Sequence, residues 1–233
     1  VQKLINAYRI RGHENAHLNP LGKPHHEPVA DLTLDYHELT DADLDQEFNT
    51  GSLAAPDRMT LRGIIDLCNR VYCASIGVEF MHIQDPGKRE WLKQRMEEKR
   101  NQPQMNRAEQ LHTLEKLQQA TLFEAFLHRK FLGQKRFSLE GGEVIIPLLD
   151  TLLTQAAERG ISDMIMGMAH RGRLNVLANT FEKPLENIFA EFQDNLELSF
   201  VGDGDVKYHK GYSTDLSLPS GHNIHLSLAA NPS

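Results

Sequence analysis

The segment 162–179 constrains the fold of this chain more than any other. Residues 162–168 form a short apolar run between turn signals, which is typical of a buried strand. His170-Arg171-Gly172-Arg173 follows directly, and 174–179 has the pattern of a helix start. A strand, a loop with glycine and arginine, and a helix make up the basic α/β unit. Ligands of such folds bind at the carboxyl ends of the strands, so we expect the functional residues there.

Helical periodicity predicts most of the remaining elements. Over 60–72 the apolar residues recur on one helix face, and Thr60 stands where an N-cap belongs. Further patterns predict helices over 1–10, 88–100, 108–132, 143–159 and 183–193, and a second strand over 222–230. No segment of 1–115 has the pattern of a strand. We therefore predict an all-helical region with a loop-rich segment, 1–115, followed by the first part of an α/β domain, 116–233.

Charge and composition exclude several function classes. The 233 residues carry 25 Lys and Arg against 32 Asp and Glu, a net charge of −7, whereas a general nucleic-acid binder needs a basic face. No apolar run approaches the roughly 18–20 residues of a membrane span, so we expect a soluble chain with no membrane partner. Cys68 and Cys73 would face different directions on a helix, and we interpret them as buried thiols in a reducing compartment.

The two ends of the chain suggest a piece of a longer protein. The chain begins at Val1 without an initiator Met, and it stops directly after an apolar run that resembles a strand. The lack of a targeting segment is therefore uninformative.

Two short motifs imitate metal sites. His13-Glu14-Asn15-Ala16-His17 matches the zinc-protease pattern, in which two His one helical turn apart bind the metal and Glu acts as the base. Gly12 and Pro20 interrupt the helix that this pattern needs, so we favour a helix end at the surface over a zinc hydrolase. Gly202-Asp203-Gly204, with Asn231 further on, imitates a magnesium–diphosphate motif, but the charged residues after it do not fit the expected helix. We predict no metal site.

The strongest local constellation is the turn 167–173. Its two arginines stand at the junction of a strand and a helix, where they can offer forked N–H donors and backbone amides to an anion. The adjacent His170 can transfer protons near neutral pH. Lys207-Tyr208-His209 and Ser213 add polar groups on a loop that contains Gly211. The residues alone fit an anion-binding site with two acid–base histidines as well as they fit an exposed basic turn.

Five longer motifs resemble one known family. They are Tyr8-Arg9-Ile10-Arg11-Gly12-His13, Gly77-Val78-Glu79-Phe80-Met81-His82-Ile83, Arg136-Phe137-Ser138-Leu139-Glu140-Gly141-Gly142, Gly167-Met168-Ala169-His170-Arg171-Gly172-Arg173-Leu174-Asn175-Val176-Leu177 and Gly204-Asp205-Val206-Lys207-Tyr208-His209. In this order they resemble the thiamine-diphosphate-dependent first component of the 2-oxoglutarate dehydrogenase complex. The resemblance covers the whole chain but only an internal, amino-proximal part of that protein. It implies part of a thiamine-diphosphate-enzyme fold of the α/β class.

The resemblance implies an enzyme that decarboxylates 2-oxoglutarate oxidatively in the tricarboxylic acid cycle. Its succinyl product would pass to a lipoyl group on the succinyltransferase component of the complex, and a flavin dehydrogenase component would complete the assembly. Thiamine diphosphate and Mg²⁺ are the implied cofactors, and the implied state is a homodimer in the bacterial cytoplasm or the mitochondrial matrix. A related 2-oxoadipate dehydrogenase activity shares most of these motifs and remains the alternative.

The resemblance also implies roles for individual residues. Arg171 matches an arginine that contacts thiamine diphosphate, while His170, His209 and Ser213 match active-centre positions near the substrate and the reacting carbon. The family's metal-binding Asp and Asn, and the glutamate that activates the aminopyrimidine of the cofactor, lie downstream of this chain. The match at Asp203 is therefore accidental, and we expect this chain by itself to be inactive.

Overall fold

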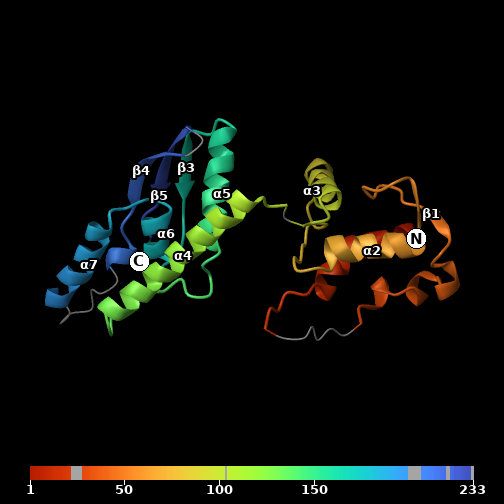
Figure 1. Cartoon of the computed structure of the whole chain (residues 1–233), viewed down its shortest axis with the longest axis horizontal. Coiled ribbons are helices and arrows are strands. Elements are labelled where there is room, and N and C mark those ends of the chain that lie inside the picture. Colours follow the sequence, from red (N-terminus) through yellow and green to blue (C-terminus); the bar gives the residue numbers. More distant parts are fainter. Residues whose placement is uncertain (22–27, 103, 199–205, 219–220, 232–233) are drawn as a thin grey trace. The chain divides into compact units, whose positions relative to one another are not determined.

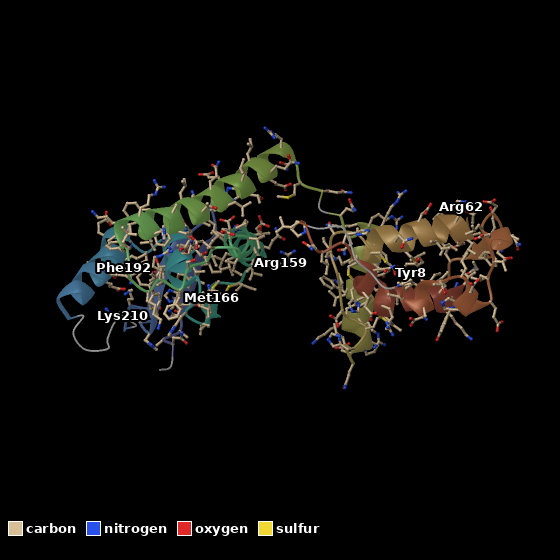
Figure 2. The ribbon with its side chains drawn as sticks, turned by 90° about the horizontal axis from the view of Figure 1, so that it is seen from below. Tyr8, Arg62, Arg159, Met166, Phe192 and Lys210 are labelled. Atoms are coloured by element: carbon tan, nitrogen blue, oxygen red, sulfur yellow. The ribbon has the colours of Figure 1, made fainter. Side chains whose placement is uncertain are left out.

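The structure is a computed structural model that describes residues 1–21, 28–102, 104–198, 206–218 and 221–231. They form two compact units, Val1–Gln104 and Met105–Ser233 (Figure 1). Each unit has its own hydrophobic core, to which Tyr8 contributes in the first unit and Phe192 in the second (Figure 2). Among the described residues, no helix combines the length and the apolar composition that crossing a bilayer requires.

The described residues of the first unit form three α-helices: α1 (Gln2–Arg11), α2 (Leu61–Tyr72) and α3 (Pro86–Glu98). The predicted cap of α2 is confirmed, because the Gly63 N–H donates to Thr60 Oγ1 at 3.2 Å. Asp85 caps α3 in the same way, ahead of a proline at the first helical position. The thiols of Cys68 and Cys73 are free and buried, as predicted.

The region 1–115 is not entirely helical, so the prediction is wrong on this point. Strands β1 (Glu47–Asn49) and β2 (Arg58–Thr60) form a short antiparallel ladder. Each strand has three residues, which is too few to show an alternating pattern. Short 3-10 helices also lie in this unit: η1 (Gly12–Asn15), η2 (Ala30–Leu32), η3 (Asp35–His37) and η4 (Asp41–Asp43).

A buried ionic network joins α1 to α3. Arg9 Nε donates to Glu97 Oε1 at 2.8 Å, and the Tyr72 hydroxyl donates to the same oxygen at 2.6 Å. The backbone N–H of Ala54 donates to the other carboxylate oxygen at 3.0 Å. Every partner of the Glu97 carboxylate therefore comes from a different segment of this unit.

The second unit is α/β, which confirms the predicted class in outline. Its sheet has the order β3-β5-β4, with β3 (Asp163–Met166) parallel and β4 (Tyr212–Ser217) antiparallel to the central β5 (Asn223–Leu228). Helices α4 (Arg107–Lys130), α5 (Ile145–Glu158), α6 (Arg173–Asn179) and α7 (Leu185–Leu198) complete it, with the 3-10 helix η5 (Val206–Tyr208) before β4. The boundary expected at residue 115 falls inside α4, whose contacts with α5 and α6 belong to the second unit.

The sheet buries one face. Ile224, Leu226 and Leu228 of β5 lie in the core, while the alternate residues of β5 point to the other side. On that other side Ile165 of β3 is 80% exposed. The helices therefore cover the face that carries the aliphatic residues of β5.

Candidate active site

The turn between β3 and α6 is fixed by its own backbone. Gly172 is the N-cap of α6, and its N–H donates to the carbonyl of Phe137 at 2.8 Å. The N–H of Arg173 donates to the carbonyl of His170 at 3.0 Å. These two amides are already hydrogen bonded, so the prediction that backbone amides of the turn would bind an anion is wrong for both of them.

Arg173 has a structural role instead of the predicted anion contact. Its side chain is fully buried, and its guanidinium donates to the carbonyls of Met168 at 3.2 Å, Lys210 at 2.9 Å and Ala229 at 2.6 Å. Burial lowers the pKa of Arg173 from its usual value. The three carbonyls follow β3, precede β4 and follow β5, so Arg173 ties together the segments at this end of the sheet.

The structure brings His170 and His209 together from two of these segments. Their ring centroids lie 4.7 Å apart with an interplanar angle of 83°, an edge-to-face contact. Phe137 and Tyr208 flank the His170 ring at centroid distances of 5.0 Å and 5.6 Å. The two histidines expected at the site are therefore direct neighbours, beside the carboxyl end of β3.

The two rings differ in their hydrogen bonding. His209 Nδ1 lies 3.0 Å from the carbonyl oxygen of Asn231, which only accepts, so Nδ1 carries the proton and Nε2 of the neutral ring is an acceptor. His170 Nε2 is buried and has no hydrogen-bond partner among the described residues. An unpaired buried polar atom costs about 1–3 kcal/mol, which a ligand that bonds to it would recover.

Arg171 is exposed next to this pair. Its Nη1 donates to the carbonyl of Ser138 at 3.2 Å, which orients the guanidinium and leaves its other N–H groups for an acceptor outside the protein. Of the two arginines in the turn, Arg171 has exposed N–H donors, whereas Arg173 is fully buried and only its Nε has no hydrogen-bond partner among the described residues.

Glu124 of α4 positions the turn, and this residue was not predicted from the sequence. Its buried Oε1 accepts from the Leu139 N–H at 3.1 Å and from Asn175 Nδ2 at 3.0 Å. Arg136 Nη1 lies 3.5 Å from the other carboxylate oxygen. Glu124 thereby fixes the segment whose residues 137 and 138 bond to the turn at Gly172 and Arg171. A carboxylate among the phenylalanines of α4 was the signal that could have revealed it.

Ser213 belongs to a different network, on the face of the sheet away from the core. Its Oγ shares a hydrogen bond of 2.8 Å with Ser227 Oγ, which lies 3.3 Å from His225 Nε2. His225 Nδ1 lies 2.7 Å from Asp215 Oδ1. The contacts of Ser213 are therefore along β4 and β5, and they do not link it to the histidine pair.

Of the two segments that imitate metal motifs, the structure describes the one with His13 and His17. Residues 12–15 form a 3-10 helix, and Ala16 is extended, so His13 and His17 do not share an α-helix as the zinc pattern requires. Asp203 lies outside the described residues. Within the described ranges, no three His, Cys, Asp or Glu side chains gather as a metal site would need.

Comparisons with known proteins agree with the resemblance found in the motifs. Over its full length the chain is 46% identical to the multifunctional 2-oxoglutarate metabolism enzyme of Mycolicibacterium vanbaalenii, of which it covers 19%. It is 42% identical over its full length to the 2-oxoglutarate dehydrogenase E1 component of Azotobacter vinelandii, of which it covers 25%. The chain thus spans about a fifth to a quarter of these curated relatives, and the predicted resemblance is confirmed. No family model matches the chain.

Proposed function

We propose that this chain is an amino-proximal part of the thiamine-diphosphate-dependent first component of the 2-oxoglutarate dehydrogenase complex. The whole protein would decarboxylate 2-oxoglutarate oxidatively and pass the succinyl group to a lipoyl group of the second component. The observation that carries this proposal is the pair of His170 and His209, with an unpartnered Nε2 on His170, beside the carboxyl end of β3. The similarity of the whole of this chain to part of two enzymes named for 2-oxoglutarate supports the proposal.

The two histidines would bind the substrate and hold protons at their ring nitrogens. His209 Nε2 accepts a proton when the ring is neutral and donates one after protonation, while Nδ1 stays bonded to Asn231. It is therefore suited to a carboxylate of 2-oxoglutarate. His170 Nε2 has no protein partner to lose when a substrate oxygen arrives. The aromatic neighbours Phe137 and Tyr208 keep its ring in place and restrict water around it.

Arg171 fits the diphosphate group of thiamine diphosphate. Its guanidinium donates one hydrogen bond to the carbonyl of Ser138, and its further N–H donors suit phosphate oxygens. When bound, thiamine diphosphate supplies the carbon centre that accepts the electrons released with carbon dioxide. The ligands of Mg²⁺ would come from the remainder of the protein. Ser213 would lie near the reacting carbon, with its hydroxyl oriented by Ser227.

The same proposal implies the partners of the whole protein. These are the lipoyl-bearing succinyltransferase component, the flavin dehydrogenase component and a second copy in a homodimer. A location in the cytoplasm would match the bacterial relatives.

Turnover by the full-length protein tests the proposal. With thiamine diphosphate and Mg²⁺, we expect carbon dioxide release from 2-oxoglutarate to exceed release from 2-oxoadipate. His170→Ala should lower the rate by about 100-fold or more, the usual scale for an acid–base group. His82→Ala, which removes an exposed histidine of the first unit, should leave the rate unchanged. Preference for 2-oxoadipate would favour the alternative activity, and turnover of neither substrate would contradict the proposal.

A further inference from the structure

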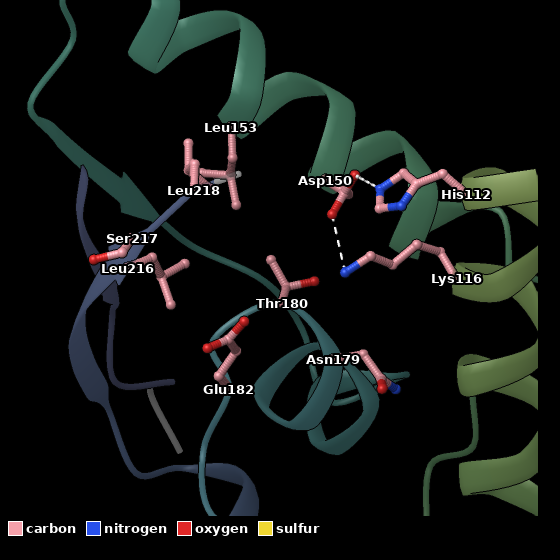
Figure 3. A pocket seen from close by; sticks show the side chains of 10 residues that line it. All are labelled: His112, Lys116, Asp150, Leu153, Asn179, Thr180, Glu182, Leu216, Ser217 and Leu218. Carbon is pink, nitrogen blue, oxygen red and sulfur yellow. Dashed lines mark hydrogen bonds and ion pairs between the residues drawn. The ribbon is translucent and has the colours of Figure 1, made fainter. Parts of the chain in front are cut away.

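A cavity lies at the end of α6 that is remote from the histidine pair. Its volume is about 160 Å³, and its walls come from α4, α5, the end of α6 and the end of β4 (Figure 3). The His170–Arg171 turn precedes the first residue of α6, whereas the cavity is lined by Asn179 and Thr180 after its last turn. A cavity of about 150 Å³ holds benzene, so a ligand of about six to eight non-hydrogen atoms fits here.

Thr180 presents an unused hydroxyl to this cavity. The residue is only 6% exposed, and its Oγ1 has no hydrogen-bond partner among the described residues. Its backbone is fixed as the C-cap of α6 by a bond from its N–H to the carbonyl of Val176. Figure 3 shows the side chain turned into the space between Lys116 and Glu182. A buried hydroxyl in this state indicates a polar ligand, because leaving it unpaired costs free energy.

Opposite charges stand on either side of Thr180. Lys116 Nζ lies 3.0 Å from Asp150 Oδ1, and His112 Nε2 lies 2.7 Å from Asp150 Oδ2, so both oxygens of this carboxylate are engaged. The Lys116 ammonium keeps further N–H donors. Glu182 lines the other side, where Figure 3 shows its carboxylate turned toward Thr180. The cavity therefore offers a cationic donor and an anionic acceptor to one small molecule.

The remaining wall is aliphatic. Leu153, Leu216 and Leu218 line it, and the first two are almost completely buried. Aliphatic groups of a ligand would be removed from water here, at a gain of about 0.8 kcal/mol for each buried CH₂.

We propose that this cavity binds a small zwitterionic α-amino acid with an aliphatic side chain, of the size of valine. Its carboxylate would accept hydrogen bonds from Lys116 and Thr180, its ammonium would donate to Glu182, and its side chain would lie against the three leucines. Valine carries an ammonium, a carboxylate and a branched aliphatic group on one carbon atom, and these three groups match the acidic, basic and aliphatic walls of the cavity. This binding does not depend on the activity proposed above.

Calorimetric titration of the 233-residue chain with valine tests the proposal. We expect saturable binding in the millimolar range, and a rise of the unfolding temperature with valine concentration. Isobutylamine is valine without its carboxylate, and isovalerate is valine without its ammonium, so each lacks one of the two charges and should bind about tenfold more weakly or worse. Absence of valine binding, or equal binding of all three compounds, would overturn the proposal.

Variants locate the binding to this cavity. Glu182→Gln and Thr180→Val should each weaken valine binding by about tenfold or more. Thr180→Val keeps the shape of the side chain and removes an unpaired hydroxyl, so its unfolding temperature without ligand should not fall. Glu186→Gln, at an exposed glutamate of α7 outside the cavity, should leave valine binding unchanged. Unchanged binding in both cavity variants would contradict the assigned site.

Discussion

Gly172 lies against Leu139 with no room for a side chain. A Cβ at position 172 would lie 2.4 Å from Leu139 Cδ1, and the glycine has φ +74°, in the left-handed region that favours glycine. Both constraints act on the residue that follows Arg171 and caps α6. The turn that carries His170 and Arg171 therefore depends on glycine at this position.

We predict that Gly172→Ala lowers the free energy of unfolding of the second unit by about 1–3 kcal/mol, because strain and a steric clash act together. Gly160 also has a left-handed backbone, with φ +81°, but a Cβ there would meet open space. Gly160→Ala should therefore lower the free energy of unfolding by less than Gly172→Ala does. Gly167→Ala has neither problem and should change little. Urea unfolding measures all three, and equal losses would contradict this account.

We predict that Glu97→Ala strongly destabilises the first unit, by about 3–5 kcal/mol in urea unfolding. The substitution leaves the guanidinium of Arg9, which is 4% exposed, without its counter-charge in the interior. Arg62→Ala breaks the exposed pair of Arg62 with Asp45 and should cost less than about 1 kcal/mol. Similar small losses for the two variants would show that the buried network does not hold α3 in place.

The two buried thiols predict a loss of stability at alkaline pH. Burial, with a smaller contribution from the Glu97 carboxylate, raises the pKa of Cys68 from 9.0 to about 12, and burial raises the pKa of Cys73 from 9.0 to about 11. Above pH 9 the unfolded chain loses these protons while the folded chain keeps them. The stabilisation that the two protonated thiols contribute is therefore complete below pH 9 and falls as the pH rises toward 11.

The expected slope is about 1.4 kcal/mol per pH unit for each thiol in the free energy of unfolding of the first unit. The double variant Cys68→Ala, Cys73→Ala should show a shallower decline between pH 9 and pH 11 in urea unfolding. An equally steep decline in the double variant would mean that other groups cause the loss.

Local signals made the helices predictable, whereas long-range pairing hid part of the sheet. Thr60 caps α2 through an oxygen three residues from its donor, so the sequence contains the whole interaction. Strand β4 contains hydroxyl-bearing, charged and apolar residues in no regular order, and only its pairing with β5 makes it a strand. Such a strand has no periodicity that distinguishes it from a polar loop.

The candidate site was likewise predictable only where its residues are close in the sequence. The residues of the turn 170–173 follow one another, so their common position was predictable from the strand–loop–helix pattern. The approach of His170 to His209 depends on the parallel pairing of β3 with β5, which no local pattern reports. Arg173 has the same sequence surroundings as Arg171, and its bonds to the carbonyls of the distant residues Lys210 and Ala229, together with that of Met168, make it a buried structural residue.

We predict that Arg171→Ala in the full-length protein weakens thiamine diphosphate binding by about 1.5–3 kcal/mol, the scale of a hydrogen bond to a charged group. Its free N–H donors beside the turn are the reason. Arg129→Ala, at an exposed arginine of α4, serves as the control and should bind the cofactor normally. Calorimetric titration with thiamine diphosphate gives both dissociation constants, and an unchanged value for Arg171→Ala would remove this residue from the cofactor site.

The comparison of 2-oxoglutarate with 2-oxovalerate, which lacks the distal carboxylate, tests the role of the histidine pair most directly. A site built to pair with that carboxylate loses this selectivity when its donor is removed. In the full-length protein, His209→Leu should lower kcat/KM for 2-oxoglutarate by about 10- to 100-fold and change the value for 2-oxovalerate far less. Because we propose that His170 chiefly moves protons, His170→Ala should lower kcat/KM for 2-oxoglutarate and for 2-oxovalerate by similar factors. If both variants keep the parent rates and the parent preference for 2-oxoglutarate, neither histidine belongs to the active site.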